Sequence, residues 1–210
     1  GAERMKYRNR LGWFPLALFL VFLLIFLGGC TPAHTFTGLV FDDLQPVGEL
    51  AGTTHRGTPF DLAELKGKLV LVFLGYTFCP DVCPTTLLEV AGAMNALAQD
   101  DPKGGASLAA LFVTIDPERD TVERLAEYLP AFHADITGVV VEPSALEQVK
   151  SNFGVYAAKS EAGPSSAAGY LMDHTAGVYV IDRQGNLLAL FSHDTPASAM
   201  AADLKVLLKR

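Results

Sequence analysis

The chain has little cysteine, with three in 210 residues, and only one tryptophan. So few cysteines exclude a small scaffold that several disulfides hold together. No internal repeat is present, which excludes solenoid and propeller architectures. Half of the residues are hydrophobic. The sequence therefore predicts one domain of ordinary size with its own core, plus an additional apolar segment.

Positive charge is also scarce beyond residue 29. Residues 1–29 hold four basic residues and one acidic residue, of 16 basic and 23 acidic in the whole chain. The remainder therefore holds 12 basic and 22 acidic residues, a net charge of −10. Because phosphate contacts need Lys and Arg, we expect no nucleic-acid partner. An acidic surface favours cations and basic protein partners, although most such charges are simply solvated.

The first thirty residues have the pattern of an export or anchor signal. Four basic residues between Arg4 and Arg10 precede residues 11–29, which carry no charge. This apolar run is near the ~20 residues that span a bilayer and longer than the ~7–15 of an ordinary signal core. It ends in Leu27-Gly28-Gly29-Cys30, which resembles the bacterial lipobox, where the cysteine is lipidated and becomes the mature N-terminus. A plain transmembrane anchor is the alternative. Both predict a domain tethered at the outer, periplasmic or extracytoplasmic, face of a bacterial cell membrane.

The rest of the chain divides into a linker, residues 31–46, and a domain, residues 47–210. A short strand at the end of the linker is an open alternative. Within the domain, continuous apolar runs predict strands covered on both faces, and capping signals mark helix starts. The expected strands are 68–76, 107–115 and 136–141; the expected helices are 61–67, 84–99, 121–132, 144–153 and 195–208; hairpins are expected at 46–60 and 177–191, an extended segment at 155–159 and a loop at 161–169.

This order of elements predicts an α/β fold. Strands and helices alternate first, and a hairpin and a closing helix follow. Such an order is typical of a mixed sheet with helices on both faces. Open α/β sheets place their sites at the carboxyl ends of central strands. A loop with two cysteines follows the strand at 68–76, so we expect the site there.

Cys79 and Cys83 are the strongest chemical signal in the sequence. They form a Cys-x-x-x-Cys loop between an apolar strand and a helix, and a proline follows each cysteine. The N–H groups at a helix N-terminus favour thiolate over thiol, and the thiolate is both nucleophile and metal ligand. A structural disulfide is the simpler interpretation, but it would close too short a loop to stabilise the fold much. The pair therefore predicts soft-metal or redox chemistry.

His174 is the candidate third ligand among five histidines. It follows the loop at 161–169 and precedes the strand at 177–182, from which it can face the cysteine loop across the sheet edge. Two thiolates and one imidazole suit copper in either oxidation state. Of its neighbours, Asp173 is expected to orient the imidazole or to cap the loop, and Met172 to pack. The other four histidines are expected on the surface: His34, His55, His133 and His193.

Three ordered blocks resemble the Sco/SenC family of copper-binding, thioredoxin-like proteins. They are Phe73-Leu74-Gly75-Tyr76-Thr77-Phe78-Cys79-Pro80-Asp81-Val82-Cys83-Pro84, Thr114-Ile115-Asp116-Pro117-Glu118-Arg119-Asp120-Thr121, and Asp173-His174-Thr175 followed by Tyr179-Val180-Ile181-Asp182. The resemblance covers about residues 47–208. It implies a thioredoxin-like fold with copper bound by Cys79, Cys83 and His174. Phe78 departs from the histidine that the family commonly has there.

The resemblance also implies a function and partners. Members of the family assist assembly of the dinuclear copper centre of cytochrome c oxidase, so the oxidase's copper-centre subunit is the expected partner, with a periplasmic copper donor or a thiol reductant beside it. Some members act instead as thiol–disulfide reductases, which would make Cys79 and Cys83 a catalytic redox pair. A peroxidase is the least favoured alternative, because no catalytic Thr-x-x-Cys pattern is present. Residues 116–120 follow a strand end, where they either form a docking surface or cap a turn.

Overall fold

A computed structural model of the protein describes residues 34–161 and 169–210. The chain divides into two units, and the second, residues 36–210, is the domain described below. The expected signal segment, with its lipobox at Cys30, lies outside the described residues. Within the described part of the chain, no helix is long and apolar enough to cross a membrane.

The domain is built on a mixed sheet with the order β1-β10-β9-β4-β5-β6-β2-β3. Strands β4, β5 and β6 pair in parallel, and the other pairs are antiparallel. This arrangement confirms the predicted thioredoxin-like α/β class. The strands are β1 (Leu39–Pro46), β2 (Ala51–Thr54), β3 (Pro59–Asp61), β4 (Leu69–Gly75), β5 (Leu108–Thr114), β6 (Ile136–Val140), β9 (Gly177–Ile181) and β10 (Asn186–Ser192).

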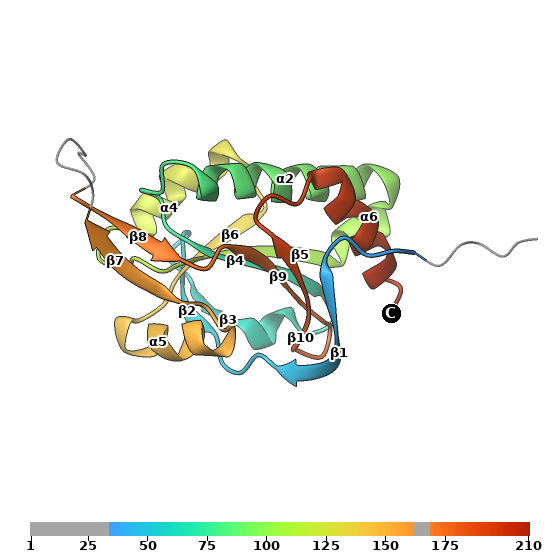
Figure 1. Cartoon of the computed structure of the whole chain (residues 1–210), viewed down its shortest axis with the longest axis horizontal. Helices are drawn as coiled ribbons and strands as arrows, with labels where there is room; N and C mark the ends of the chain where they lie inside the picture. Colours follow the sequence, from blue (N-terminus) through green and yellow to red (C-terminus); the bar gives the residue numbers. More distant parts are fainter. Residues whose placement is uncertain (1–33, 162–168) are drawn as a thin grey trace, which may run out of the picture. The chain divides into compact units, whose positions relative to one another are not determined.

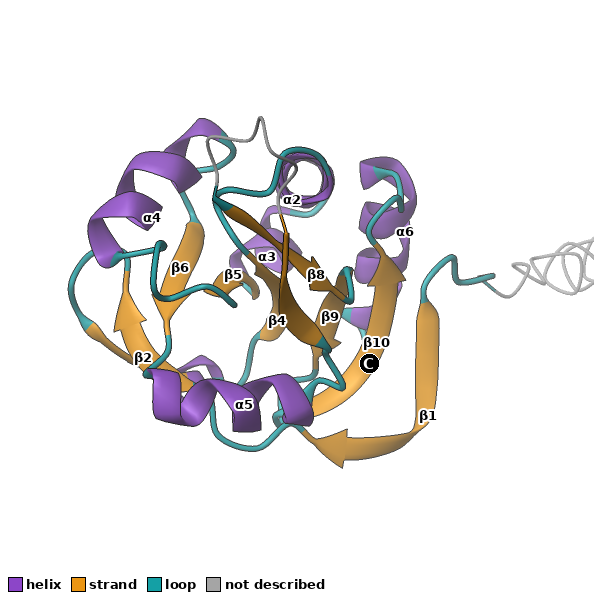
Figure 2. Cartoon of the chain, turned by 60° about the vertical axis from the view of Figure 1, so that its left-hand side comes forward, coloured by secondary structure: helices purple, strands orange, loops and turns teal. Residues whose placement is uncertain are grey.

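Helices cover both faces of this sheet, as predicted. Helices α2, α4 and α6 lie above it in Figure 1 and α5 lies below, and the turned view of Figure 2 agrees. The helices are α2 (Val82–Asp100), α3 (Pro102–Ala106), α4 (Val122–Tyr128), α5 (Pro143–Asn152) and α6 (Ala197–Leu207), with 3₁₀ turns η1 (Leu62–Leu65) and η2 (Leu129–Ala131).

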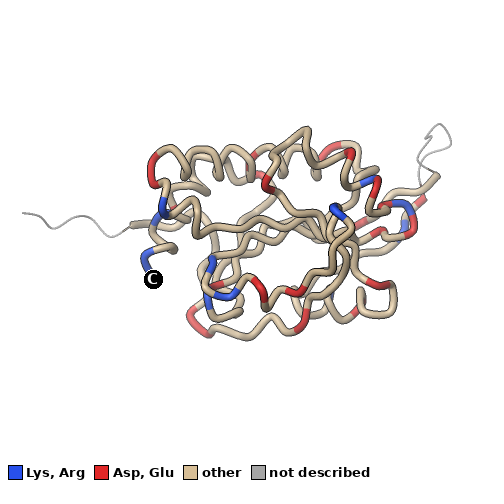
Figure 3. Tube along the Cα trace, turned by 180° about the vertical axis from the view of Figure 1, so that it is seen from behind, with Lys and Arg blue, Asp and Glu red and all other residues tan. Residues whose placement is uncertain are grey.

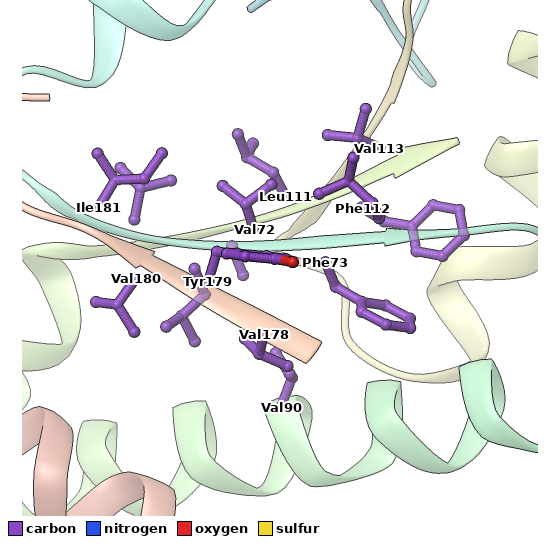
Figure 4. Close-up of a cluster of buried hydrophobic side chains, with 14 of the residues drawn as sticks. Val72, Phe73, Val90, Leu111, Phe112, Val113, Val178, Tyr179, Val180 and Ile181 are labelled. Carbon is purple, nitrogen blue, oxygen red and sulfur yellow. The ribbon is translucent and has the colours of Figure 1, made fainter. Parts of the chain in front are cut away.

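The core lies on both sides of the central strand β4, whose seven residues are all buried. Alternate side chains of a strand point to opposite faces, so a run of apolar residues supplies two core layers. In Figure 4, Phe73 and Val178 point toward the helix that carries Val90, while Val113 and Ile181 lie on the opposite face. Burying one such side chain contributes roughly 1.5–3 kcal/mol. The packed core thus fixes the carboxyl end of β4, where the cysteine loop begins.

A separate two-stranded sheet carries the histidine. It consists of β7 (Ala157–Glu161) and β8 (Tyr170–His174), which pair antiparallel, so that Ala157 lies opposite His174. In Figure 1 this pair extends beyond the main sheet at the left. The extended segment at 155–159 was expected, but the strand β8 was not. Its side chains are half-buried or exposed, so it lacks the apolar pattern by which a strand is recognised.

Three predictions need correction or completion. Of the linker at 31–46, whose end was left open to a short strand, residues 39–46 form the strand β1 and pair with β10. That strand is mostly exposed and has no alternating pattern, so backbone hydrogen bonds rather than apolar burial define it. The helix expected from residue 84 begins at Val82, which moves Cys83 into its first turn. His55 is buried rather than exposed, and its Nδ1 accepts a hydrogen bond from the Gly138 amide.

Candidate metal centre

The two cysteines lie where β4 passes into α2. Cys79 is in the connecting loop, and Cys83 is the second residue of the helix. The residue that caps the helix, Asp81, makes no side-chain capping bond. Instead the sulfur of Cys79 accepts a hydrogen bond from the Cys83 amide, at 3.4 Å. The sulfur thus occupies the place of a helix-capping oxygen, where the helix dipole favours its negative charge.

A glycine at the end of β4 makes room for the second thiol. A Cβ atom on Gly75 would lie 3.1 Å from the sulfur of Cys83 and 3.0 Å from the rings of Phe73 and Phe112. These contacts are tighter than a side chain normally tolerates. Cys83 is fully buried, whereas Cys79 is partly exposed. Partners therefore reach the pair through Cys79.

The two thiols have opposite acidities. Hydrogen bonds from the Cys83 thiol and, to a smaller extent, from His174 lower the pKa of Cys79 to about 3, against the effect of burial. The hydrogen bond between the two thiols and then burial raise the pKa of Cys83. In the reduced, metal-free pair, Cys79 is therefore the thiolate and Cys83 the proton donor. A metal that takes both sulfurs must displace the proton of Cys83.

His174 closes the group from the other side, as the sequence predicted. It is the last residue of β8, and its Nε2 lies 3.7 Å from the sulfur of Cys83. Its Nδ1 lies 3.0 Å from the carbonyl oxygen of Thr175 and can donate a hydrogen bond to it, which leaves the lone pair of Nε2 to bind a metal. The Thr175 carbonyl thus takes the orienting role that was considered for Asp173, which is exposed. The three ligand atoms lie within 4.8 Å of one another, and no other such group of three His, Cys, Asp or Glu residues is found in the described part of the chain.

Tyr76 joins the cysteine loop to β8, a role that the sequence did not reveal. Its hydroxyl accepts a hydrogen bond from the Met172 amide at 3.2 Å. Its ring meets the His174 ring edge to face, with centroids 5.8 Å apart. Burial raises the pKa of this tyrosine, so its hydroxyl stays protonated. Met172 packs against the core, as expected.

Two of the acidic residues at 116–120, Asp116 and Asp120, are structural rather than part of a docking surface. Asp120 is fully buried and accepts hydrogen bonds from Thr77 and Thr114. Burial raises its pKa in spite of those bonds. Asp116 is 2% exposed and pairs with Arg119 at 2.6 Å. The docking alternative is therefore wrong for both aspartates, of which Asp120 holds the loop after β5 against Thr77 at the start of the cysteine loop.

The surface of the domain agrees with the acidic balance of the sequence. Acidic residues are spread over loops and helix ends, and the basic residues form no continuous stripe in the view of Figure 3. A small site with two sulfurs and one imidazole nitrogen suits a soft or borderline metal. The donors present therefore fit copper.

Comparisons with known proteins agree with the geometry. A family model described as SCO1/SenC matches residues 45–209. The SCO2-like protein RC0895 of Rickettsia conorii is 32% identical over 178 residues, which cover 83% of this chain and 84% of that protein. The chain spans only 46% of the Arabidopsis thaliana protein named Protein SCO1 homolog 1, mitochondrial, to which it is 31% identical.

Two solved structures share the fold. Bradyrhizobium japonicum ScoI with copper bound is 36% identical, with a TM-score of 0.67, covering 76% of this chain and 98% of that one. The apo Sco1 protein from Thermus thermophilus is 38% identical, with a TM-score of 0.72, covering 85% of this chain and 99% of that one. The first holds the metal that the Cys79, Cys83 and His174 group is able to bind. From its matched length and its relatives, this chain belongs to the SCO1/SenC family.

Proposed function

We propose that this protein is a membrane-tethered copper metallochaperone that assists assembly of the dinuclear copper centre of cytochrome c oxidase. The convergence of two sulfurs and an imidazole nitrogen within 4.8 Å carries the proposal. In it, Cys79, Cys83 and His174 are the copper ligands. Family membership supports the oxidase's copper-centre subunit as the partner that receives the metal.

The three ligands serve the two oxidation states of copper differently. Two thiolates are enough for Cu(I), whereas Cu(II) also favours a nitrogen ligand. Cys79 already carries the charge that a cation needs, and Cys83 contributes its sulfur once its proton is released. A site built in this way accepts copper in either state, and it presents the metal on the side of Cys79, the more exposed of the two thiols.

The tether belongs to the same proposal. The apolar run at 11–29 and the lipobox-like Cys30 support a tether that would hold the domain at the outer face of a bacterial membrane. A copper site on the same membrane as the oxidase meets its target at high effective concentration. A periplasmic copper donor or thiol reductant would complete the cycle.

A second function is favoured by the acidity of Cys79. A thiolate with a pKa of about 3 beside a buried thiol is the arrangement of a thiol–disulfide oxidoreductase. Cys79 would attack a disulfide in the oxidase subunit and release one of its sulfurs as thiolate. Cys83 would then displace the second sulfur and form a Cys79–Cys83 disulfide, so that two electrons pass to the target. This chemistry does not need His174.

The proposal is tested by measuring cytochrome c oxidase activity in cells grown under copper limitation. We expect Cys79→Ser to lower oxidase activity when copper is scarce. If delivery is the function, added copper restores the activity by mass action, whereas an added thiol reductant does not. Rescue by the reductant alone would favour the oxidoreductase, and unchanged oxidase activity would contradict both functions.

His174→Ala separates the two functions in the same assay. A delivery protein should lose activity with this variant under copper limitation, because its Cu(II) site loses the nitrogen ligand. A reductase should keep the activity, because the thiols remain.

Mass spectrometry of the wild-type membrane protein tests the tether. It should show a lipidated Cys30 as the first residue, and Cys30→Ala should remove this attachment point. An unmodified Cys30 inside an intact chain would establish the transmembrane anchor.

A further inference from the structure

The strand that carries His174 is contacted by Arg119, which lies in the loop after β5. Among the described strands, β8 pairs only with β7 and lies outside the main sheet. At the far end of β8 from His174, the Arg119 side chain donates a hydrogen bond to the Tyr170 carbonyl, at 2.9 Å. The guanidinium carbon also lies 3.5 Å from the centroid of the Tyr170 ring. Arg119 thus contacts both the backbone and the side chain of Tyr170.

The same guanidinium also lies close to the cysteine loop. It lies 4.7 Å from the centroid of the Phe78 ring, next to Cys79 in sequence. The Phe78 ring, which stands where the family commonly has a histidine, is therefore one surface of this contact. One arginine links the segment with the thiols to the segment with the imidazole.

A buried carboxylate fixes the arginine. The Nε of Arg119 donates to Asp116 at 2.6 Å, and the other oxygen of Asp116 accepts from the Tyr170 hydroxyl at 2.6 Å. The Asp116 amide in turn bonds to Thr114 at the end of β5. Charge-assisted bonds of this kind, between planar and mostly buried groups, allow little freedom. These bonds thereby connect β8 to strand β5 of the main sheet.

We propose that Arg119 is a positioning residue for copper: it holds β8 so that His174 stays within reach of the two sulfurs. This inference rests on the proposed function, in which His174 is a copper ligand. A strand transmits a displacement along its length, and His174 is four residues from Tyr170, ~13 Å at 3.3 Å per residue. When β8 is loose, only a fraction of molecules has the imidazole in place, and the apparent Cu(II) affinity falls by that fraction.

The test compares two arginines that share the Phe78 ring. Because removing Arg119 alone leaves Asp116 with a buried charge, the test variant is Arg119→Gln together with Asp116→Asn, which removes both charges at once. The control is Arg124→Gln. Arg124 also lies over the Phe78 ring, at 5.4 Å, and donates to Thr77, but no contact between it and β8 is found among the described residues.

Copper titrations of the reduced protein give the first readout. We expect the test variant to weaken Cu(II) about tenfold, as changes to the outer partners of a metal ligand do. The thiolate-to-Cu(II) absorption should lose its histidine-dependent character, and the Cu(I) affinity should change less than about threefold. Arg124→Gln should leave both affinities unchanged. Arg119→Lys should recover part of the Cu(II) affinity, because it restores the ion pair but not the planar stack.

His174→Ala distinguishes failure of this inference from failure of the proposed function. If His174→Ala leaves Cu(II) binding unchanged, the ligand assignment itself is wrong. If His174→Ala weakens Cu(II) and the test variant does not, only the positioning role of Arg119 is contradicted. The test variant should also have no further effect on Cu(II) in a His174→Ala background, because both changes act through the imidazole; an additive loss would contradict the inference.

Hydrogen exchange of the metal-free protein supplies a readout that needs no copper. The Met172 amide bonds to Tyr76 in the middle of β8, and it should exchange about tenfold faster in the test variant. Amides of β4 should exchange as in the parent if the fold is intact. Equal protection of Met172 in the test variant, with β4 intact, would overturn the proposed positioning.

Discussion

The cysteine loop and the β7–β8 pair contribute to one site but are built in different ways. Cys79 and Cys83 are four residues apart, and they sit between a fully buried strand and a helix of 19 residues. His174 lies 91 residues beyond Cys83, on a strand with no fully buried side chain. The thiols are held by the core, whereas the strand that carries the imidazole is contacted through hydrogen bonds with Tyr76 and Arg119.

This difference has a consequence for the metal. Local stability follows the number of buried apolar contacts, so β8 should open more readily than the start of α2. The thiols then form a constant part of the site and the imidazole an adjustable one. An oxidation state that needs only sulfur should be insensitive to β8, whereas one that needs nitrogen should depend on it. The predictions below test this division, from the largest effect to the smallest.

Removing both thiols should abolish the site for either oxidation state. We expect Cys79→Ala with Cys83→Ala to weaken Cu(I) and Cu(II) by more than about a hundredfold, beyond what outer partners of a ligand contribute. Copper titration with a competing chelator measures the loss. The fold should persist, because most of the core lies elsewhere, and circular dichroism checks this. Tight copper binding by this variant would refute the proposed centre.

The pH dependence of thiol alkylation should separate the two cysteines. Because the pKa of Cys79 is lowered to about 3, its thiolate persists as the pH falls from 7 to 5. Its alkylation rate should therefore stay nearly constant, whereas that of an ordinary thiol falls about a hundredfold over this range. Mass spectrometry of the reduced, metal-free protein gives the rates. Cys83→Ala should move the profile to higher pH by removing the thiol donor; an unchanged profile would contradict this cause.

Removing the imidazole should affect one oxidation state far more than the other. For His174→Ala we expect Cu(II) to weaken by at least about tenfold and Cu(I) by less than about threefold, since only Cu(II) favours nitrogen. Parallel titrations with each ion measure the ratio. His193→Ala, at another half-buried histidine, is the matched control. Equal losses of affinity for both ions would contradict the division of the site into constant thiols and an adjustable imidazole.

Removing one hydroxyl should loosen β8 slightly. Tyr76→Phe keeps the ring against His174 but loses the acceptor for the Met172 amide. A net hydrogen bond contributes about 1 kcal/mol, so the Met172 amide should exchange about fivefold faster. Tyr156→Phe, at a side chain 66% exposed, is the control and should change nothing. Unaltered exchange in Tyr76→Phe would show that this hydroxyl does not hold the strand.

Much of the fold and the thiol half of the site could be read from the sequence. The seven apolar residues of β4 and the cysteines after them are close in the chain, so local pattern is enough to place them. Strand β8 was missed because it lacks an apolar pattern and owes its form to pairing with β7. The exposed strand β1 was predicted as a linker for the same reason, since its partner β10 is remote in sequence.

The amino-acid sequence by itself determined which groups come together: two thiols at a helix start and one imidazole. Its three motif blocks also led to the family. Only the tertiary structure decided how those groups are held. Asp116 and Arg119 lie together in the loop after β5, whereas Tyr170 comes from β8, and nothing in the local sequence of either segment indicates the other. Long-range polar contacts depend on how the chain packs, and local patterns do not record that packing.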